Sequence, residues 1–558
     1  MREIIGFAAL AAALAAPCAA APSARFAEMS YAARDVPETP AGHYRNPVLP
    51  GFQPDPSIVR VGEDFYLVNS TFSWFPGIPI YHSRDLVNWR LIGHAIDRPG
   101  QFDFSGLGTN RGVFAPAIEW HDGRFYILNT CIECRGNFLV TAERPEGPWS
   151  DPVWLDFEGI DPSLFVDEDG TAWIVNNGAP VGEPRYEGHR SIWIQQFDLE
   201  KRQLFGPRKV LVESGVHPED EPVWAEGPHI YKVDGRYVLT AAEGGTAEAH
   251  SQVALVADRP DGPYTPDPHN PFLTQRDLPR DRDFPITSAG HADLVQTPDG
   301  DWWATFLAVR PYGEDFYNTG RETFLMPVTW ENGWPRITAP GEVIPHVLDR
   351  PDLPEQPAPD LPTSGPFSVT EDFDGETLPV HWLTVRNPRS DWFSVADGAL
   401  HLTARPQGLG DMANPSFAAR RQQHMSAVAS TELRFTPAHD GDRAGLAAFQ
   451  SDDFWWFIGV GRHEGQDVVL VERRAGPDDP ARGVIIASAP LPVPPGEPLR
   501  LRANVDVGEI DLAFSAPDGD WTPLVEGGDA SILSTRTAGG FVGSVFGAYA
   551  YSPAGPAD

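Results

Sequence analysis

The sequence predicts an all-β protein, a five-bladed β-propeller followed by a β-sandwich of jelly-roll type. Three observations support this prediction: many turn residues, five similar segments in the first part of the chain, and alternating strand patterns after a proline-rich stretch. The chain has 558 residues, enough for two domains with sizeable cores. Its 53 glycines and 57 prolines, with few long helical patterns, favour short strands joined by turns.

Five segments share one pattern, in which a short opening precedes an apolar strand, a polar turn and an aromatic-rich strand. They begin at Asp55, Ala115, Asp161, Glu226 and His291, between 46 and 65 residues apart. Each interval has room for about four strands, and turns such as "VDG" and "PDG" are hairpin signals. Five such units around one axis make a propeller, which we place over residues 44–344. Unrelated hairpins in a sandwich are the alternative, which the likeness of the repeats disfavours.

The remainder of the chain divides at a proline-rich stretch. Residues 345–366 hold seven prolines and predict a stiff linker on the surface. Residues 367–558 contain alternating segments such as "STELRFTP" and "PLRLRANVDVGEIDLAFSA" and few helix signals. They predict a two-sheet sandwich.

The N-terminus predicts a signal peptide over residues 1–23. Arg2 precedes an apolar run that is too short to span a bilayer but suits a signal-peptide core. We therefore expect a periplasmic or secreted protein with no membrane attachment after signal removal. A lipid anchor on Cys18 is disfavoured because Pro17 directly precedes it. Cys131 and Cys134 could form a short-loop disulfide in an oxidising compartment, or stay idle.

The charge balance restricts the partners. With 42 basic and 78 acidic residues, the net charge is −36, which repels phosphate backbones and argues against nucleic acid. A neutral sugar is compatible with this charge, and aromatic rings suit sugar faces as well as protein cores. The sequence leaves open whether identical chains assemble.

Four of the five opening residues are ionisable: Asp55, Asp161, Glu226 and His291. Equivalent positions of a propeller converge on its axis, so these side chains should share one mouth. An aspartate before proline also suits an ordinary turn. However, folding alone does not explain such a cluster, because like charges held close destabilise one another. Glycoside hydrolysis uses two carboxyl groups that flank the glycosidic bond, and a third carboxylate can raise the pKa of the one that acts as acid. The residues themselves do not identify which carboxylate is the acid.

Several long motifs resemble glycoside hydrolase family 43, from about residue 44 to the end of the chain. They are "NPVLPGFQPDPSIVRVGEDFYLVNSTFSWFPG", "IDPSLF", "WAEGPHIYKVDGRYVLTAAEGGT", "SAGHADLVQTPDGDWW" and "GRETFLMPVTWENGWP". The most similar branch contains β-xylosidases and α-L-arabinofuranosidases with a C-terminal sandwich. The resemblance implies a five-bladed propeller, an inverting mechanism and a sandwich loop that closes the pocket.

By its motifs, the resemblance also implies roles. Asp55 corresponds to the general base, Glu226 to the general acid, and Asp161 to the residue that raises the pKa of the acid and orients it. His291 and Arg321 correspond to residues beside the bound sugar, although Arg321 could instead form a structural salt bridge. In some members this histidine also contacts a calcium ion, often through water, so Ca²⁺ stays open while no cofactor is required.

Aromatic residues should line the pocket. Phe72 and Trp74 resemble pocket-wall residues, with a place in the blade core as the alternative. Phe114 stands where members of this branch often carry Trp. The sandwich loop "GGFVGSVFGAYA" should bring Val545 or Phe546 into the pocket.

We expect release of terminal β-D-xylosyl units from xylo-oligosaccharides or oligosaccharides derived from arabinoxylan. Release of α-L-arabinofuranosyl units is the alternative, as a further or main activity. A non-catalytic sugar-binding propeller is a third possibility, disfavoured because all three carboxylates are present.

Overall fold

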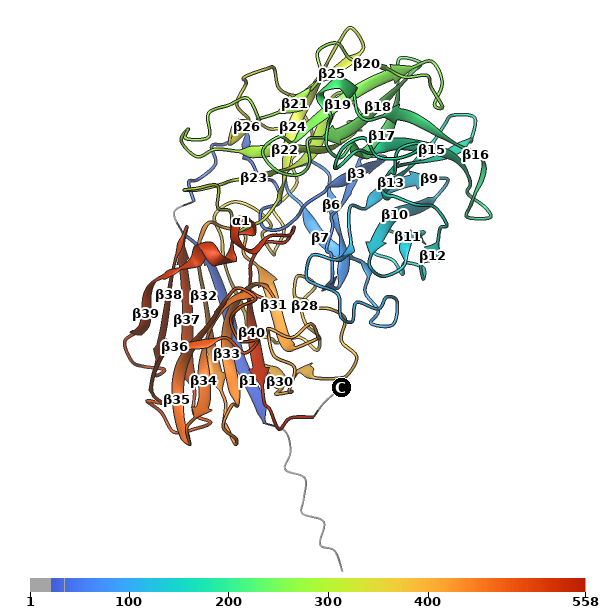
Figure 1. Ribbon diagram of the computed structural model, residues 1–558. Helices are drawn as coiled ribbons and strands as arrows, with labels where there is room; N and C mark the ends of the chain where they lie inside the picture. The colour runs from blue at the N-terminus through green and yellow to red at the C-terminus, as the bar shows by residue number, and fades with distance from the viewer. Residues whose placement is uncertain (1–21, 35, 557–558) are drawn as a thin grey trace, which may run out of the picture.

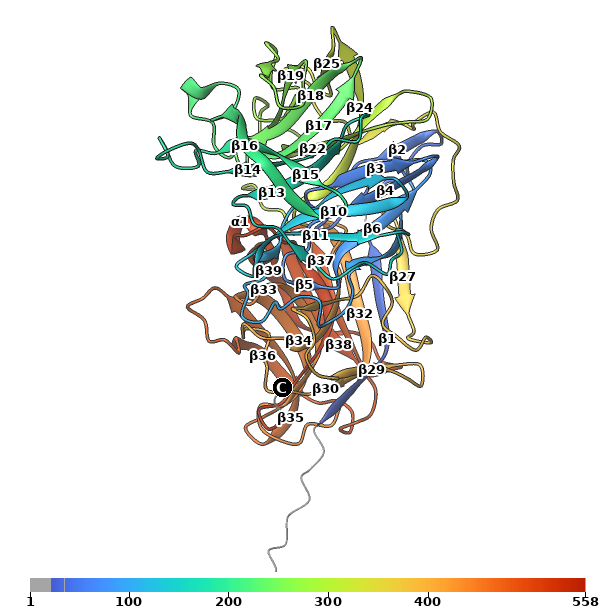
Figure 2. The same cartoon turned by 90° about the vertical axis from the view of Figure 1, so that its right-hand side faces the viewer.

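The computed structural model describes residues 22–34 and 36–556 and consists almost wholly of β-strands (Figure 1). A propeller and a sandwich pack against each other, which confirms the predicted fold class. Figure 2 shows the same two bodies from the side. The predicted signal peptide, with Cys18, falls almost wholly on residues 1–21, outside the described residues. No helix of the described part is long and apolar enough to cross a membrane.

Five antiparallel sheets form the blades, and their inner strands β3, β9, β13, β17 and β22 neighbour one another around the axis. Blade one comprises β3 (Ser57–Val61), β4 (Asp64–Val68), β6 (Gly77–Ser83) and β7 (Arg90–Ile96). Blade two comprises β8 (Gly112–Val113), β9 (Ala117–His121), β10 (Arg124–Ile132), β11 (Gly136–Ala142) and β12 (Val153–Trp154). Blade three comprises β13 (Ile160–Val166), β14 (Ala172–Gly178), β15 (Ser191–Asp198) and β16 (Gln203–Glu213).

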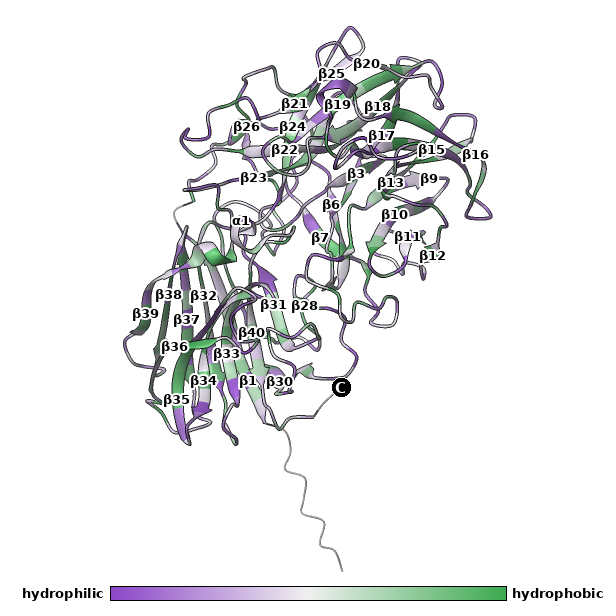
Figure 3. Ribbon diagram, in the orientation of Figure 1, coloured by the Kyte–Doolittle hydropathy of each residue, from purple (hydrophilic) through white to green (hydrophobic). Residues whose placement is uncertain are grey.

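The last two blades complete the ring. Blade four comprises β17 (Glu226–Val233), β18 (Arg236–Glu243), β19 (Ser251–Ala257), β20 (Thr265–Pro266) and β21 (Leu273–Thr274), after a 3-10 turn, η1 (Pro218–Asp220). Blade five comprises β22 (Thr287–Gln296), β23 (Trp302–Val309), β24 (Glu322–Glu331) and β25 (Trp334–Arg336). Figure 3 shows hydrophobic residues on strands of both domains, such as β18 and β35. Burial of these apolar faces is the main force that holds the blades together.

The two ends of the propeller are tied by a short ladder. Strand β2 (His43–Arg45) pairs with β26 (Val347–Asp349), which lies inside the stretch predicted as linker. The rest of that stretch runs along blade one, where Thr363 Oγ1 donates a hydrogen bond of 2.9 Å to the Trp89 carbonyl. The linker is therefore fixed to the propeller surface.

Two sheets of eight strands form the sandwich around a common core. The first contains β29 (Phe393–Val395), β30 (Leu400–Thr403), β1 (Ser23–Ala33), β32 (Ser426–Arg434), β37 (Leu499–Asp506), β38 (Glu509–Ser515) and β39 (Thr522–Asp529), with β27 (Ser368–Glu371) on β1. The second contains β36 (Val484–Pro490), β35 (Gln466–Ala475), β34 (Phe454–His463), β33 (Arg443–Ser451), β40 (Val545–Tyr551), β31 (Ser416–Arg421), β28 (Leu383–Val385) and β5 (Trp74–Phe75). Short helical turns, η2 (Ala530–Leu533) and α1 (Thr535–Ala538), precede β40.

The two sandwich sheets each contain one strand from the N-terminal part of the chain, β1 in the first and β5 in the second, which the sequence did not predict. β1 lies between β30 and β32, and its alternating residues Ala24, Phe26 and Tyr31 are buried in the sandwich core (Figure 1). β5 follows blade-one strand β4 yet pairs with β28 of the sandwich. The domains are therefore interlocked by main-chain hydrogen bonds as well as by apolar packing.

Candidate active site

Equivalent backbone positions open the inner strand of four blades. Asp55, Asp161 and His291 all adopt a φ of 52°, and Gly227 adopts 55°. Each stands two residues before the first regular ladder pair of its inner strand, such as Ser57 with Val68. The left-handed conformation turns the side chains of Asp55, Asp161 and His291 toward the mouth of the ring, a strained geometry that is common at functional sites.

Glu226 lies one position earlier than the sequence repeat suggested. The residue equivalent to Asp55 is Gly227, and a Cβ at Gly227 would lie only 2.7 Å from Nε2 of His291. Only glycine fits there, because both the positive φ and the imidazole exclude a side chain. Glu226 instead shares its position with Phe114 of blade two and Ile160 of blade three. Two successive rings of residues thus face one pocket.

The pocket brings together most of the predicted site residues. Its walls are Asp55, Phe72, Phe114, Ala115, Ile160, Asp161, Glu226, Thr246, His291, Arg321 and Phe541. The three carboxylate residues line this pocket and are only 5–7% exposed.

Asp55 is held by two donors. Arg321 Nη1 lies 3.0 Å from Asp55 Oδ1 and Nη2 lies 3.4 Å from Oδ2, and Ser70 Oγ also donates to Oδ2. The forked guanidinium therefore offsets the aspartate charge and fixes its orientation. Arg321 forms the salt bridge considered as an alternative and also lines the pocket, so the two interpretations are compatible.

The other two carboxyls hold protons more tightly than usual. Burial, and then the charge of Asp55, raises the pKa of Asp161 to about 8, against a hydrogen bond from the Gly227 N–H. Burial, and then the charges of Asp161 and Asp55, raises the pKa of Glu226 well above its usual range. These groups titrate together, and a proton stays on this pair at neutral pH. Glu226 is thus suited to donate a proton.

His291 is neutral at neutral pH. Burial lowers its pKa to about 4, and its Nδ1 lies 4.0 Å from Asp55 Oδ1. Calcium requires about six to eight oxygen ligands, whereas His291 offers one nitrogen. The described residues contain no group of three or more His, Cys, Asp or Glu able to hold a metal ion. They therefore do not fit a calcium ion held directly by protein groups.

Three phenylalanines form the apolar wall, one of them from the sandwich. Phe541 stacks on Phe72 with ring centroids 5.8 Å apart and meets Phe114 edge-on at 5.8 Å. The Phe541 loop is fixed to the propeller because the Phe541 N–H donates to Asn110 Oδ1 at 2.7 Å. The Arg321 guanidinium lies 5.1 Å from the Phe541 ring centre. The sandwich therefore closes one side of the pocket.

Two predictions of pocket residues are wrong. Phe546 and Val545 lie in β40 and are fully buried in the sandwich, because alternate residues of this central strand pack into apolar cores on both faces. The pocket residue is Phe541, earlier in the same "GGFVGSVFGAYA" motif. Trp74 is also fully buried, in the apolar cluster between the domains, because β5 joins the sandwich sheet.

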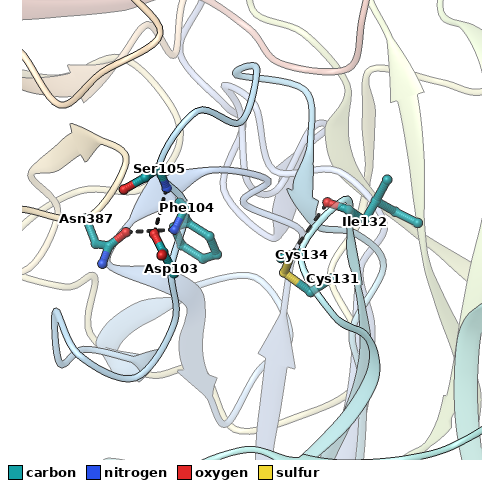
Figure 4. The surroundings of a disulfide bond; sticks show 7 residues. All are labelled: Asp103, Phe104, Ser105, Cys131, Ile132, Cys134 and Asn387. Carbon is teal, nitrogen blue, oxygen red and sulfur yellow. Dashed lines mark hydrogen bonds between the residues drawn. A yellow bond between two sulfur atoms is a disulfide. The ribbon is translucent and has the colours of Figure 1, made fainter.

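Cys131 and Cys134 form a disulfide that closes the turn between β10 and β11, with Cα atoms 5.5 Å apart (Figure 4). Cys131 pairs in register with Val113 of β8, and Val113 forms an isolated bridge with Phe72. The disulfide therefore lies behind the aromatic wall. Figure 4 also shows Asn387 of the sandwich accepting a hydrogen bond from the Phe104 N–H, at 3.0 Å.

Comparisons with known proteins agree with this geometry. The profile of Glycosyl hydrolases family 43 matches residues 44–335, and that of the beta xylosidase C-terminal Concanavalin A-like domain matches residues 370–558. A non-reducing end alpha-L-arabinofuranosidase of Bacteroides ovatus is 35% identical over 91% of both chains. A xylosidase/arabinosidase of Butyrivibrio fibrisolvens is 36% identical over 91% of this chain and 95% of its own.

Solved structures show the same two-domain architecture. The crystal structure of a GH43_12 protein retrieved from a capybara gut metagenome is 36% identical, covers 95% of this chain and all of its own, and has a TM-score of 0.88. A xylan beta-1,4-xylosidase from Bacillus halodurans is 34% identical over 91% of this chain and 96% of its own, with a TM-score of 0.81. With its propeller, its carboxylate-lined pocket and these relatives, the chain belongs to glycoside hydrolase family 43 and is a glycosidase.

Proposed function

We propose that this glycosidase is exo-acting and inverting, and that it releases terminal β-D-xylosyl units from xylo-oligosaccharides. The observation that carries the proposal is the pairing of a proton-holding Glu226 with an Arg321-bound Asp55 in one pocket that Phe541 closes. A closed pocket admits the end of a chain rather than its middle. A carboxylic acid and a carboxylate are the two groups that an inverting hydrolysis requires.

In this mechanism, Glu226 donates its proton to the leaving glycosidic oxygen. Asp55 accepts a proton from a water molecule that attacks the anomeric carbon from the opposite face of the sugar. Arg321 holds Asp55 in place, while Phe72, Phe114 and Phe541 offer apolar surface to the sugar ring. Burial raises the pKa of Glu226, and the Asp161 carboxylate, when ionised, raises it further. The space for the water requires the two carboxyls to lie about 6.5–9.5 Å apart.

Release of α-L-arabinofuranosyl units is the second candidate. The relatives described above carry names of both activities, and the two pentoses present similar hydroxyl patterns. Phe114 and Phe541 offer apolar faces without the indole N–H of a tryptophan, which leaves fewer donors to discriminate hydroxyl positions.

The proposal is tested by comparing kcat/KM on 4-nitrophenyl β-D-xylopyranoside and 4-nitrophenyl α-L-arabinofuranoside. We expect the xyloside to be the better substrate, and a higher value for the arabinofuranoside would make the second candidate the main activity. NMR of the first product from xylobiose should show the α-anomer of xylose. A β-anomer would show retention and overturn the inverting mechanism.

We further propose that the protein is exported, with xylo-oligosaccharides or arabinoxylan-derived oligosaccharides as its only required partners. The N-terminal pattern and the Cys131–Cys134 disulfide support export, because structural disulfides persist in oxidising compartments. A calcium ion contacting His291 through water, and assembly of identical chains, stay predictions. Detection of the protein in a periplasmic or culture fraction, with its first twenty or so residues (roughly the length of a signal peptide) removed, would test export.

A further inference from the structure

A small cavity lies where the propeller, the linker and the sandwich meet. Its volume is about 30 Å³. The residues that define it are Gln53 and Tyr81 of the propeller, Thr363 of the linker, and His381, Arg420 and Arg421 of the sandwich. It is separate from the active-site pocket, and the mechanism above uses none of these residues.

Two buried guanidiniums line this cavity. Arg420 and Arg421 are each only 5% exposed. Arg421 Nε donates to the Phe52 carbonyl at 2.9 Å, and Arg420 Nη2 donates to Gln423 Oε1 at 3.1 Å. Arg421 Nη2 and Arg420 Nε are buried and have no hydrogen-bond partner among the described residues. These two positively charged N–H groups therefore need a hydrogen-bond acceptor that the described residues do not provide.

Two other arginines of the described residues pair with a carboxylate. Arg310 binds Glu322 at 2.7 Å and Arg386 binds Asp452 at 2.7 Å. In the part of the chain that the structure describes, Arg420 and Arg421 make no ion pair within 4.0 Å. Glu371 attracts Arg420 only from a longer distance. Buried charges without a partner are costly, so this pair is an exception that calls for a counterion.

The neighbouring titratable groups do not supply a negative charge. Burial raises the pKa of Tyr31 to about 12, and burial also raises the pKa of Tyr81. Burial and the two arginines lower the pKa of His381 to about 3. At neutral pH these three side chains are uncharged, so none of them offsets the charge of the two guanidiniums.

We propose that this cavity binds one monatomic halide ion, chloride under ordinary conditions. A single water needs at least about 10–15 Å³, so 30 Å³ leaves room for one chloride ion. The unpartnered N–H groups of Arg420 and Arg421 donate to the ion, and its charge offsets theirs.

The ion would join three parts of the molecule. Arg421 holds the Phe52 carbonyl, three positions before Asp55, and the Gln53 N–H donates to the Arg321 carbonyl at 3.0 Å. The halide therefore fixes the docking of the sandwich on the segment that carries Asp55 and Arg321. We expect halide to stabilise the folded protein, as does any ligand that binds only the native state.

The test uses the full-length protein exchanged into sodium gluconate, with sodium bromide added at constant ionic strength. We expect Tm to rise saturably by roughly 2 °C or more, since binding to the native state alone raises Tm. Crystals soaked in bromide should show an anomalous peak between Arg420 and Arg421. Absence of that peak overturns the proposal without any variant, so it does not depend on whether a variant folds.

Variants sharpen the result. Arg421→Met and Arg420→Met should each lose the bromide-dependent rise in Tm. The matched control is Arg434→Met on β32, whose side chain is 41% exposed, and it should keep the full rise. Equal rises with sulfate and bromide, or a rise that persists in both Arg420 and Arg421 variants, would contradict a halide site. Turnover is not measured, so failure here leaves the proposed hydrolysis intact.

Discussion

The propeller and the sandwich contribute opposite chemistry to one pocket. The propeller supplies every ionisable group, namely three carboxyls, one imidazole and one guanidinium, and all of them except Arg321 lie where the inner strands of the blades begin. The sandwich supplies a single ring, Phe541, on a loop outside any repeat. This difference teaches that symmetry gathers the reacting groups, whereas domain docking encloses them. Substitutions of the reacting groups in the propeller should therefore lower kcat, whereas substitution of Phe541 in the sandwich should mainly raise KM.

The largest effect is expected from Glu226→Gln, on the propeller side. Loss of the general acid should lower kcat on xylobiose by about 10²–10⁴-fold. A 4-nitrophenyl glycoside has a better leaving group and depends less on the acid. The fall in kcat on this substrate should therefore be clearly smaller than the fall on xylobiose.

Asp55→Asn is the matched control for that comparison. Loss of the base should lower turnover of both substrates to a similar extent, because both need an activated water. Equal losses of the two substrates in Glu226→Gln would contradict the assignment of Glu226 as acid.

Asp161→Asn tests whether the charges within the propeller act on each other. The Asp161 carboxylate raises the pKa of Glu226, so its removal should lower that pKa. Activity needs protonated Glu226 and is lost as the pH rises through its pKa. The alkaline limb of the kcat/KM profile should therefore move to lower pH, measured on 4-nitrophenyl β-D-xylopyranoside. If the alkaline limb stays at the same pH, Asp161 orients Glu226 without raising its pKa.

A smaller effect is expected from Phe541→Ala, on the sandwich side. The variant removes apolar surface that contacts the sugar but no reacting group, so KM should rise about tenfold, roughly 1.4 kcal/mol, with kcat less affected. Phe205→Ala is the control, since Phe205 lies on the propeller surface and is 46% exposed. A drop in kcat equal to that of Glu226→Gln would contradict the assignment of the reacting groups to the propeller and of pocket closure to the sandwich.

The smallest effect is expected from Cys131→Ser with Cys134→Ser. The disulfide closes a short loop, which corresponds to about 2 kcal/mol of stability from loop-closure entropy. Tm should fall by a few degrees, while kcat/KM at 25 °C stays within about twofold of the parent. A large loss of activity with an unchanged Tm would show that the disulfide orders the aromatic wall directly.

Much of the fold and of the charged site could be predicted because both repeat. The openings at Asp55, Asp161 and His291 share a spacing and, in the structure, one backbone conformation. Glu226 appeared to share it, but the repeat cannot show a one-residue offset caused by a glycine and a neighbouring imidazole. Its protonation depends on burial, which no local pattern reveals.

The rest depends on contacts between distant segments. Trp74 lies beside β28 and Phe541 lies beside Asn110. Neither contact corresponds to a repeating sequence pattern from which it could be predicted. A motif placed an aromatic residue near the C-terminus, yet the alternation of β40 directs Phe546 into the core instead. The sandwich membership of β1 was missed for the same reason.

The position of β1 has a consequence for biosynthesis. Thr431 Oγ1 donates to the Glu28 carbonyl, across 403 residues of chain. A ribosome therefore completes the whole propeller before the first strand meets its neighbour β32. A product that ends before residue 426 lacks β32 and leaves that edge of β1 unpaired, and unpaired strand edges are prone to aggregation. The first sandwich sheet can therefore be completed only after the chain beyond the propeller has been synthesised.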